Sequence, residues 1–244
     1  GLSFTVHGNL TASSMKLGGA SFVVEGNLTS NGSIDLSGTT MTVNGDMVST
    51  GDVDLSGGTL TVTGTLYQQG GQMFIDGGKL LVGGNYYIAG EGSNCDAGSY
   101  KGTNGTLVMT NSSDEVRVGG NFGTSSYRGV SSSSGYNRLT NGTMYIGGNF
   151  RQVKSDSAYN FDTSGDHTVV FNGAGMQTIQ FDSNYSGFSK VKFQNPNIEL
   201  KGSYLRGFTL NDDIYLTMST DTLNLSQTDS GMRQAEWIPW DEMN

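Results

Sequence analysis

A valine or another large apolar residue stands two positions before a glycine again and again along this chain of 244 residues. The glycines of this pattern are Gly8, Gly26, Gly45, Gly64, Gly84, Gly120 and Gly148, and the first five follow one another at steps of 18, 19, 19 and 20 residues. A unit of this length is too short for a βαβ motif of ~30 residues or a four-stranded propeller blade of ~40. The spacing therefore predicts short β coils that stack on one another by parallel pairing.

Side-chain alternation predicts which face of each coil is buried. Large apolar residues of one parity flank the glycine in each repeat, as at Met41, Val43 and Met47. Because alternate residues of a strand share a face, this column is predicted to point inward, with Thr, Ser and Asn outward. A second short strand is predicted in the other half of each early coil, at Met15 to Leu17, Ile34 to Leu36, Val53 to Leu55 and Met73 to Ile75. The glycine, which lacks a Cβ, suits a bend or the close approach of a neighbouring coil.

The predicted fold class is all-β: a right-handed parallel β-helix, or β-solenoid, with coils of about 19 residues and lateral loop insertions. Val24, Val43, Val62 and Val82 are expected to stack in one interior column. Regular coils are predicted over 1–182, less regular coils over 183–226, and a cap or linker over 227–244. From Tyr86 onward the steps grow to 36 and 28 residues. The extra residues, at about 88–105, 123–141 and 151–166, are predicted to emerge from the same edge.

Composition excludes several classes of function. The net charge of -9 argues against nucleic-acid binding, since that affinity comes mainly from Lys and Arg neutralising phosphates. Cys95 is the single cysteine, so no internal disulfide or cysteine-type zinc site is expected, and an exported protein of this kind looks bacterial. With no run of ~18 apolar residues, no membrane insertion is predicted. The chain begins inside a repeat without Met, so we expect a fragment whose export signal is encoded elsewhere.

A search for catalytic motifs finds little. His7 is predicted to point outward and His167 to lie in a polar turn, so both are expected to be surface histidines without a neighbouring nucleophile. There is no zinc-protease motif, phosphate-binding loop or nucleophile elbow. The sequence therefore predicts no catalytic residues, no metal ligands and no cofactor, and the protein is expected not to be an enzyme.

Two carboxylates leave one chemical alternative open. Asp35 and Asp54 are predicted to face outward on neighbouring coils about 4.8 Å apart, near Lys16. Such a pair could bind calcium or supply an acid and a base for polysaccharide cleavage. Lys16 before the pair and Phe74 after it interrupt the column, and Asp before a glycine turn is common. A role in the turn is the simpler interpretation.

Residues 26–36, Gly-Asn-Leu-Thr-Ser-Asn-Gly-Ser-Ile-Asp-Leu, resemble the roughly 19-residue repeats of filamentous-haemagglutinin-like β-helices. Residues 105–122 and 165–179 resemble repeats in very large surface proteins and polymorphic toxins of Gram-positive bacteria. The resemblance spans roughly residues 3 to 182 and lies in the serial order of loose motifs. It implies a stalk or display element whose adhesive or toxic activity resides in other parts. The secretion cap of the haemagglutinin family is not recognisable at the N-terminus.

The leading hypothesis is a non-catalytic structural module of a large secreted or cell-surface bacterial protein, with flanking domains of the same polypeptide as neighbours. The alternative is an adhesin that binds a surface glycan or receptor through aromatic and basic side chains of the insertions. Its candidate ligand-binding residues are Tyr100, Tyr127, Arg128, Tyr136, Arg138 and Tyr159. The competing interpretation of these loops is that they cover the core or form a shoulder. A polysaccharide lyase is the third possibility.

Overall fold

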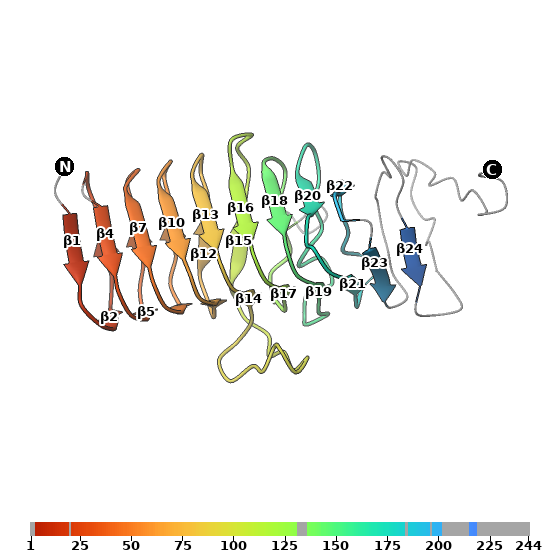
Figure 1. Cartoon of the computed structure of the whole chain (residues 1–244), viewed down its shortest axis with the longest axis horizontal. Coiled ribbons are helices and arrows are strands. Elements are labelled where there is room, and N and C mark those ends of the chain that lie inside the picture. Colours follow the sequence, from red (N-terminus) through yellow and green to blue (C-terminus); the bar gives the residue numbers. More distant parts are fainter. Residues whose placement is uncertain are drawn as a thin grey trace.

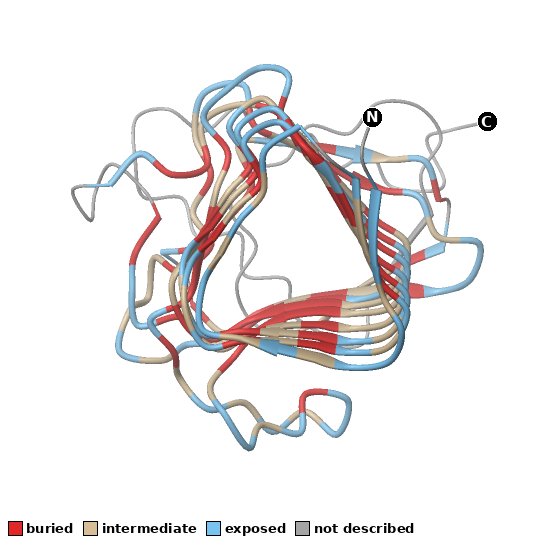
Figure 2. Ribbon diagram, turned by 90° about the vertical axis from the view of Figure 1, so that its left-hand side faces the viewer, coloured by how far each residue is buried: buried red, intermediate tan, exposed pale blue. Residues whose placement is uncertain are grey.

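The computed structural model describes residues 3–19, 21–130, 136–183, 185–195 and 197–201, together with the backbone of 215–218. The described residues form three parallel sheets and contain no helix, and therefore none that could cross a membrane. Successive coils visit the three sheets in turn, so the coils stack along one long axis (Figure 1) around a triangular cross-section (Figure 2). The predicted fold class, a parallel β-solenoid, is confirmed, and its right hand stays a prediction.

Sheet A has nine strands. They are β1 (Ser3–Val6), β4 (Ser21–Val24), β7 (Thr40–Val43), β10 (Thr59–Val62), β13 (Lys79–Val82), β16 (Glu115–Val118), β18 (Thr143–Ile146), β20 (Thr168–Phe171) and β22 (Lys190–Phe193). Each strand pairs in parallel with the equivalent strand of the next coil.

Sheets B and C complete each coil. Sheet B contains β2 (Leu10–Ala12), β5 (Leu28–Ser30), β8 (Met47–Ser49), β11 (Leu66–Gln68), β14 (Tyr86–Ile88), β17 (Phe122–Thr124), β19 (Phe150–Gln152), β21 (Gln177–Phe181), β23 (Asn197–Lys201) and β24 (Tyr215–Met218). Sheet C contains β3 (Met15–Lys16), β6 (Ile34–Asp35), β9 (Val53–Asp54), β12 (Gln72–Phe74) and β15 (Thr106–Val108).

The interior column of valines lies where the sequence places it. Val24, Val43, Val62 and Val82 are register partners in β4, β7, β10 and β13, and none is more than 3% exposed. Phe4, in the same sheet, pairs with Phe22 but is 55% exposed. Among the described residues it has a neighbouring coil on one side only, so the predicted burial of Phe4 is wrong.

Each early coil has three strands, whereas the sequence pattern predicted two. Val43, Gly45 and Met47 keep one parity, but the chain turns at Gly45 from sheet A into sheet B. A Cβ on Gly45 would lie 2.9 Å from the carbonyl carbon and oxygen of Gly26 in the preceding coil. Glycine is therefore required here by the close approach of two backbones at a corner, as predicted for this position.

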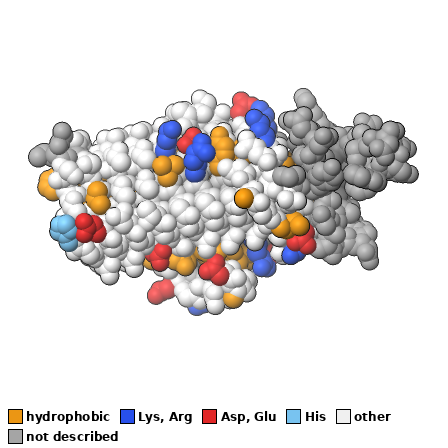
Figure 3. Space-filling model, in the orientation of Figure 1, with side chains coloured by type: hydrophobic (Ala, Val, Ile, Leu, Met, Phe, Trp, Pro, Cys, Tyr) orange, Lys and Arg blue, Asp and Glu red, His pale blue; other side chains and the backbone are white. Residues whose placement is uncertain are grey.

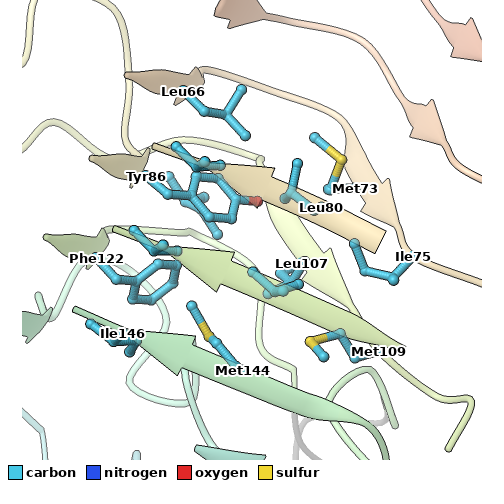
Figure 4. Packing of buried hydrophobic residues seen from close by; sticks show 14 of the residues in the cluster. Leu66, Met73, Ile75, Leu80, Tyr86, Leu107, Met109, Phe122, Met144 and Ile146 are labelled. Carbon is cyan, nitrogen blue, oxygen red and sulfur yellow. The ribbon is translucent and has the colours of Figure 1, made fainter. Parts of the chain in front are cut away.

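One continuous apolar core fills the solenoid from Val24 to Leu200. Side chains of equivalent positions lie above one another, as Leu66, Tyr86 and Phe122 do in Figure 4. The Tyr86 hydroxyl donates a hydrogen bond of 2.6 Å to Gln68 Oε1, which satisfies this polar group inside the core.

Three long loops leave the solenoid at one corner. Residues 89–105 connect β14 to β15, residues 125–142 connect β17 to β18, and residues 153–167 connect β19 to β20. Because β14, β17 and β19 are neighbours in sheet B, the loops follow one another along the same edge. The loop over 89–105 projects farthest in Figure 1. Past β15 the third side of the coil holds isolated parallel bridges, such as Met109 to Leu139.

The C-terminal part continues the ladder as far as it is described. β22 pairs with β20, and β23 pairs with both β21 and β24. The predicted cap or linker over 227–244 lies outside the described residues, as do 202–214 and 219–226.

Candidate functional site

The loop over 89–105 folds back onto the outer face of sheet B. Tyr87 points outward from β14, yet it is only 1% exposed, because the loop covers it. Its hydroxyl donates a hydrogen bond of 2.5 Å to Asp96 Oδ1, and Asn85 Nδ2 donates to the same oxygen at 3.1 Å. This loop therefore forms a shoulder, as one of the two sequence interpretations proposed.

Tyr100, a predicted ligand-binding residue, belongs to this shoulder. Its ring meets the Tyr87 ring edge-on, with 6.1 Å between the two centroids. The Cζ atom of Arg151 lies 5.6 Å from the centroid of the Tyr100 ring. A Cβ on Gly123 would lie 2.8 Å from Cε1 of Tyr100, so the ring packs directly against the β17 backbone. Burial raises the pKa of the Tyr100 hydroxyl. Tyr100 is thus mainly a packing residue.

Cys95 lies in the same small cluster, with Tyr87 and Ala89. Its side chain is buried, and it forms no disulfide. Burial, assisted by the charge of Asp96, raises the pKa of the thiol to about 11, so the thiol stays protonated at neutral pH.

The second loop carries four of the predicted residues. Tyr127 and Tyr136 are 44% and 49% exposed, and Arg128 is also exposed. Arg138 is only 9% exposed, and its Cζ lies 3.8 Å from the centroid of the Tyr136 ring. The backbone N–H of Tyr127 donates to the carbonyl of Thr103 at 2.6 Å, which ties this loop to the first one.

Tyr159, the remaining predicted ligand-binding residue, lies elsewhere on the shoulder. Its ring packs against that of Tyr185 with centroids 4.9 Å apart. The carbonyl of Tyr159 accepts a hydrogen bond from the Val130 N–H at 2.9 Å, which joins the second and third loops through their backbones. The six predicted residues therefore form three local groups along one continuous shoulder.

Asp35 and Asp54 are register partners on neighbouring strands, and Lys16 contacts Asp35 at 3.0 Å, as the spacing predicted. Asp35 Oδ1 accepts hydrogen bonds from the N–H and hydroxyl of Ser37, and Asp54 Oδ1 does the same for Ser56. The bond from Ser37, with that from Lys16, lowers the pKa of Asp35. This geometry fits the turn role.

The two histidines differ sharply. His7 is exposed, as predicted, and its Nδ1 lies 2.7 Å from Glu25 Oε2. His167, by contrast, is 0% exposed, so its predicted surface position is wrong. It shares parity with Val169 and Phe171 at the start of β20 and therefore points into the core. Burial lowers the pKa of His167 to about 3, and neither ring nitrogen has a hydrogen-bond partner among the described residues.

A ladder of Asn and Asp side chains at the corner between sheets A and B was missed by the sequence analysis. Asn9 Oδ1 accepts the Asn27 N–H at 2.8 Å, Asn27 Oδ1 accepts that of Asp46 at 2.9 Å, and Asp46 Oδ1 accepts that of Thr65 at 2.7 Å. The ladder resumes from Asn85 through Asn121 and Asn149 to Thr178. The sequence signal that could have predicted this ladder is the Asn or Asp that follows most of the corner glycines.

Within the described ranges, no group of three or more His, Cys, Asp or Glu side chains is arranged to hold a metal ion. Comparisons of the chain with protein-family models, curated proteins and solved structures yield no match.

Proposed function

We propose that the chain is a non-catalytic structural module, a stalk or display element of a large bacterial protein that is secreted or held at the cell surface. The observation that carries this proposal is the unbroken parallel ladder of sheet A from β1 to β22 around a single core. Repeat folds of this kind resist bending because each coil bonds to its neighbours along the axis.

The corner ladder reinforces the stack. Each Asn or Asp side chain joins its own coil to the backbone of the next, so it adds a side-chain bond parallel to the strand ladder. At the other end of the sheet B strands, the buried Ser49 Oγ also finds a partner, because it donates a hydrogen bond of 3.0 Å to the Gly51 carbonyl. A rod of this type keeps its shape without a disulfide, which suits a chain with one cysteine.

The outer surface fits a hydrated spacer. Figure 3 shows that uncharged polar side chains and backbone make up most of the visible face along the regular coils. Outward positions of sheet A include Thr40, Thr42, Thr59 and Thr61. Over the regular coils, the described part of this face has little tendency to bind nucleic acid or lipid, because uncharged polar groups make up most of it.

Rigidity along the axis is the property to test. In a Cys95→Ser background, spin labels at Thr42→Cys and Lys192→Cys occupy one outward column of sheet A, six strand spacings of ~4.8 Å or about 29 Å apart. Pulsed electron resonance should give one narrow distance distribution. A broad distribution contradicts the stalk, and cleavage of polysaccharide by the purified chain contradicts the non-catalytic proposal.

A second candidate function is binding of a carbohydrate or receptor by the loops. The exposed rings of Tyr127 and Tyr136 beside Arg128 favour it, because large aromatic side chains on a protein surface are typical of recognition sites.

A further inference from the structure

Cations without an acidic partner are concentrated on the shoulder. The Lys and Arg side chains that pair with a carboxylate in the described ranges all lie on strands: Lys16, Lys79, Arg117, Arg151, Lys190 and Lys201. In the same ranges, those without such a partner are Lys101, Arg128, Arg138 and Lys154 on the loops and Lys192 on β22. This distribution is notable in a chain whose net charge is -9.

Arg138 is the most informative of these cations. Its Nη1 donates a hydrogen bond of 2.5 Å to the Gly129 carbonyl, and its Nε donates one of 3.2 Å to Gln72 Oε1. Both acceptors are neutral, so Arg138, a residue that is only 9% exposed, carries its charge without a carboxylate partner among the described residues. A buried charge is costly unless an opposite charge accompanies it, so an anion bound here would lower the free energy of the site.

Arg128 places a second cation on the same loop. It directly precedes Gly129, whose carbonyl accepts the hydrogen bond from Arg138 Nη1, and its side chain is exposed. Burial lowers the pKa of Arg138, and the charge of Arg128 contributes to this lowering. Two cations on one loop that have no carboxylate partner among the described residues favour an anion, since one carboxylate can accept hydrogen bonds from both.

Two exposed aromatic rings lie on the same loop as the two cations. The Arg138 guanidinium covers one face of the Tyr136 ring, and Tyr136 remains 49% exposed. The Tyr127 ring lies over Gly102, where even a Cβ would overlap it, so the ring has a flat support from the first loop. Aromatic faces held in this way can pack against the apolar face of a sugar ring.

The backbone at Arg138 and Leu139 is bonded to the solenoid. The Arg138 N–H donates to the Val130 carbonyl at 2.9 Å, and the Arg138 carbonyl accepts the Met109 N–H at 2.6 Å. Leu139 forms a parallel bridge with Met109 of the preceding coil. A binding residue whose backbone is held in place before binding loses less conformational entropy when its ligand arrives.

We propose that Arg128 and Arg138, with the rings of Tyr127 and Tyr136, bind the carboxylate of an acidic saccharide. The guanidinium groups would hold the carboxylate, and a tyrosine ring would support the sugar that carries it. Sialic acids and hexuronic acids share this chemistry. The inference rests on the second candidate function and is independent of the stalk. A polyphosphate such as DNA is disfavoured because the negative charge of the whole chain repels a dense polyanion.

Two matched pairs of probes separate the carboxylate from the sugar. Calorimetric titration of the intact chain would compare sialyllactose with lactose, and trigalacturonate with its methyl ester. At least one acidic saccharide should bind about ten-fold more tightly than its neutral counterpart. Equal affinity within both pairs, or no binding by either acidic saccharide, overturns the proposal, while the spin-label distance still tests the stalk separately.

Charge-matched variants locate the site. Arg128→Gln should weaken binding of the acidic saccharide about ten-fold, and Tyr127→Ala should also weaken it. Lys192→Gln removes another exposed charge, on β22, and should leave binding unchanged. Circular dichroism would establish that each variant is folded. Equal losses in Arg128→Gln and Lys192→Gln, or tighter binding of a short DNA duplex than of either saccharide, would refute the assignment.

Discussion

The coils of residues 21–82 and those of residues 106–195 solve the same packing problem in different ways. In the first region the coil length is nearly constant, so one residue type recurs at each place and aliphatic side chains stack in columns. In the second region sheet C ends at β15, and isolated bridges form the third side. Aromatic side chains fill much of the interior there. Phe150, for example, lies 4.8 Å from Phe161 and 5.0 Å from Phe181 between ring centroids.

The difference shows that constant coil length, and not apolar content, is what permits a repeated core. Where the length varies, the register within sheets A and B is kept, but each coil needs its own interior packing. Buried polar groups occur in both regions. Ser30, Ser49 and Gln68 form one column in the first region, and the second region buries Gln152, Asn160 and the titratable His167. The later region should therefore be more sensitive to pH and to changes in the size of core residues.

The largest effect is expected in the aliphatic column of the first region. Val43→Asp buries a charge without a partner and should lower the free energy of unfolding by several kcal/mol, on the order of the cost of an unpaired buried polar group. Thr42→Asp, on the outward side of the same strand, should change it by about 0.5 kcal/mol or less. Urea titrations followed by circular dichroism would compare them. Similar midpoints would contradict the inward assignment of Val43.

A slightly smaller loss is expected in the aromatic interior of the second region. Phe150→Ala should cost about 3–5 kcal/mol, because the cavity opens among several rings that cannot all move into it. Phe4→Ala makes the same chemical change at a ring that is 55% exposed, so its effect should be much smaller. If Phe4→Ala proves as damaging in the same denaturation assay, the aromatic cluster has no special role.

The dependence of stability on pH should come partly from His167. Its pKa is lowered by burial to about 3 in the folded state, from 6.5 for an exposed histidine. The unfolded chain therefore gains a proton first as the pH falls, and stability is lost between pH 6.5 and about 3. Between pH 7.5 and 5 the loss should be about 2 kcal/mol.

His167→Leu removes this titration and should flatten the pH profile, whatever it does to stability at pH 7.5. Phe161→Leu changes the neighbouring ring, which lies 6.5 Å from His167 between centroids, and should keep the slope of the wild type. Denaturation at a series of pH values measures both. An unchanged slope in His167→Leu would show that His167 is not the group responsible.

The smallest effect is expected at the corner ladder. Asn27→Ala removes the acceptor of the Asp46 N–H and should cost about 1 kcal/mol. Asn27→Asp should lose little, because Asp46 already fills the same role one coil later. Asn44→Ala, at an exposed position outside the ladder, serves as the control. Equal thermal stability of Asn27→Ala and Asn44→Ala would argue that the ladder adds nothing.

The sequence predicted the features that depend on near neighbours in the repeat. Val43 was placed correctly because parity and spacing together define an interior column. The third side of the coil was missed because the turn at Gly45 preserves the alternation of side chains. His167 was misplaced because the polar Gly165-Asp166 before it suggested a turn, although its parity with Val169 indicated the core.

The sequence predicted which residues form the candidate site but not how they are arranged in space. The sequence identified Tyr127, Arg128, Tyr136 and Arg138, which the structure brings to one loop region. It could not predict that Tyr100 packs under its own loop, because that contact depends on how residues 89–105 fold back onto sheet B. Nor could it predict that Arg138 is buried, since the acceptors of its hydrogen bonds come from separate parts of the chain.

The corner at which the three loops leave the solenoid is a place where other loop segments can be grafted. Ile88 and Thr106 stay in the ladder on both sides of a long excursion, so the ladder does not depend on what lies between them. Closing a loop of twice the length costs only about 0.6 kcal/mol more. The loop over 89–105, whose apolar residues pack outside the main core, can therefore be exchanged or lengthened while the rod stays the same. In the other two loops Val130, Leu139 and Phe161 belong to the core and must be kept.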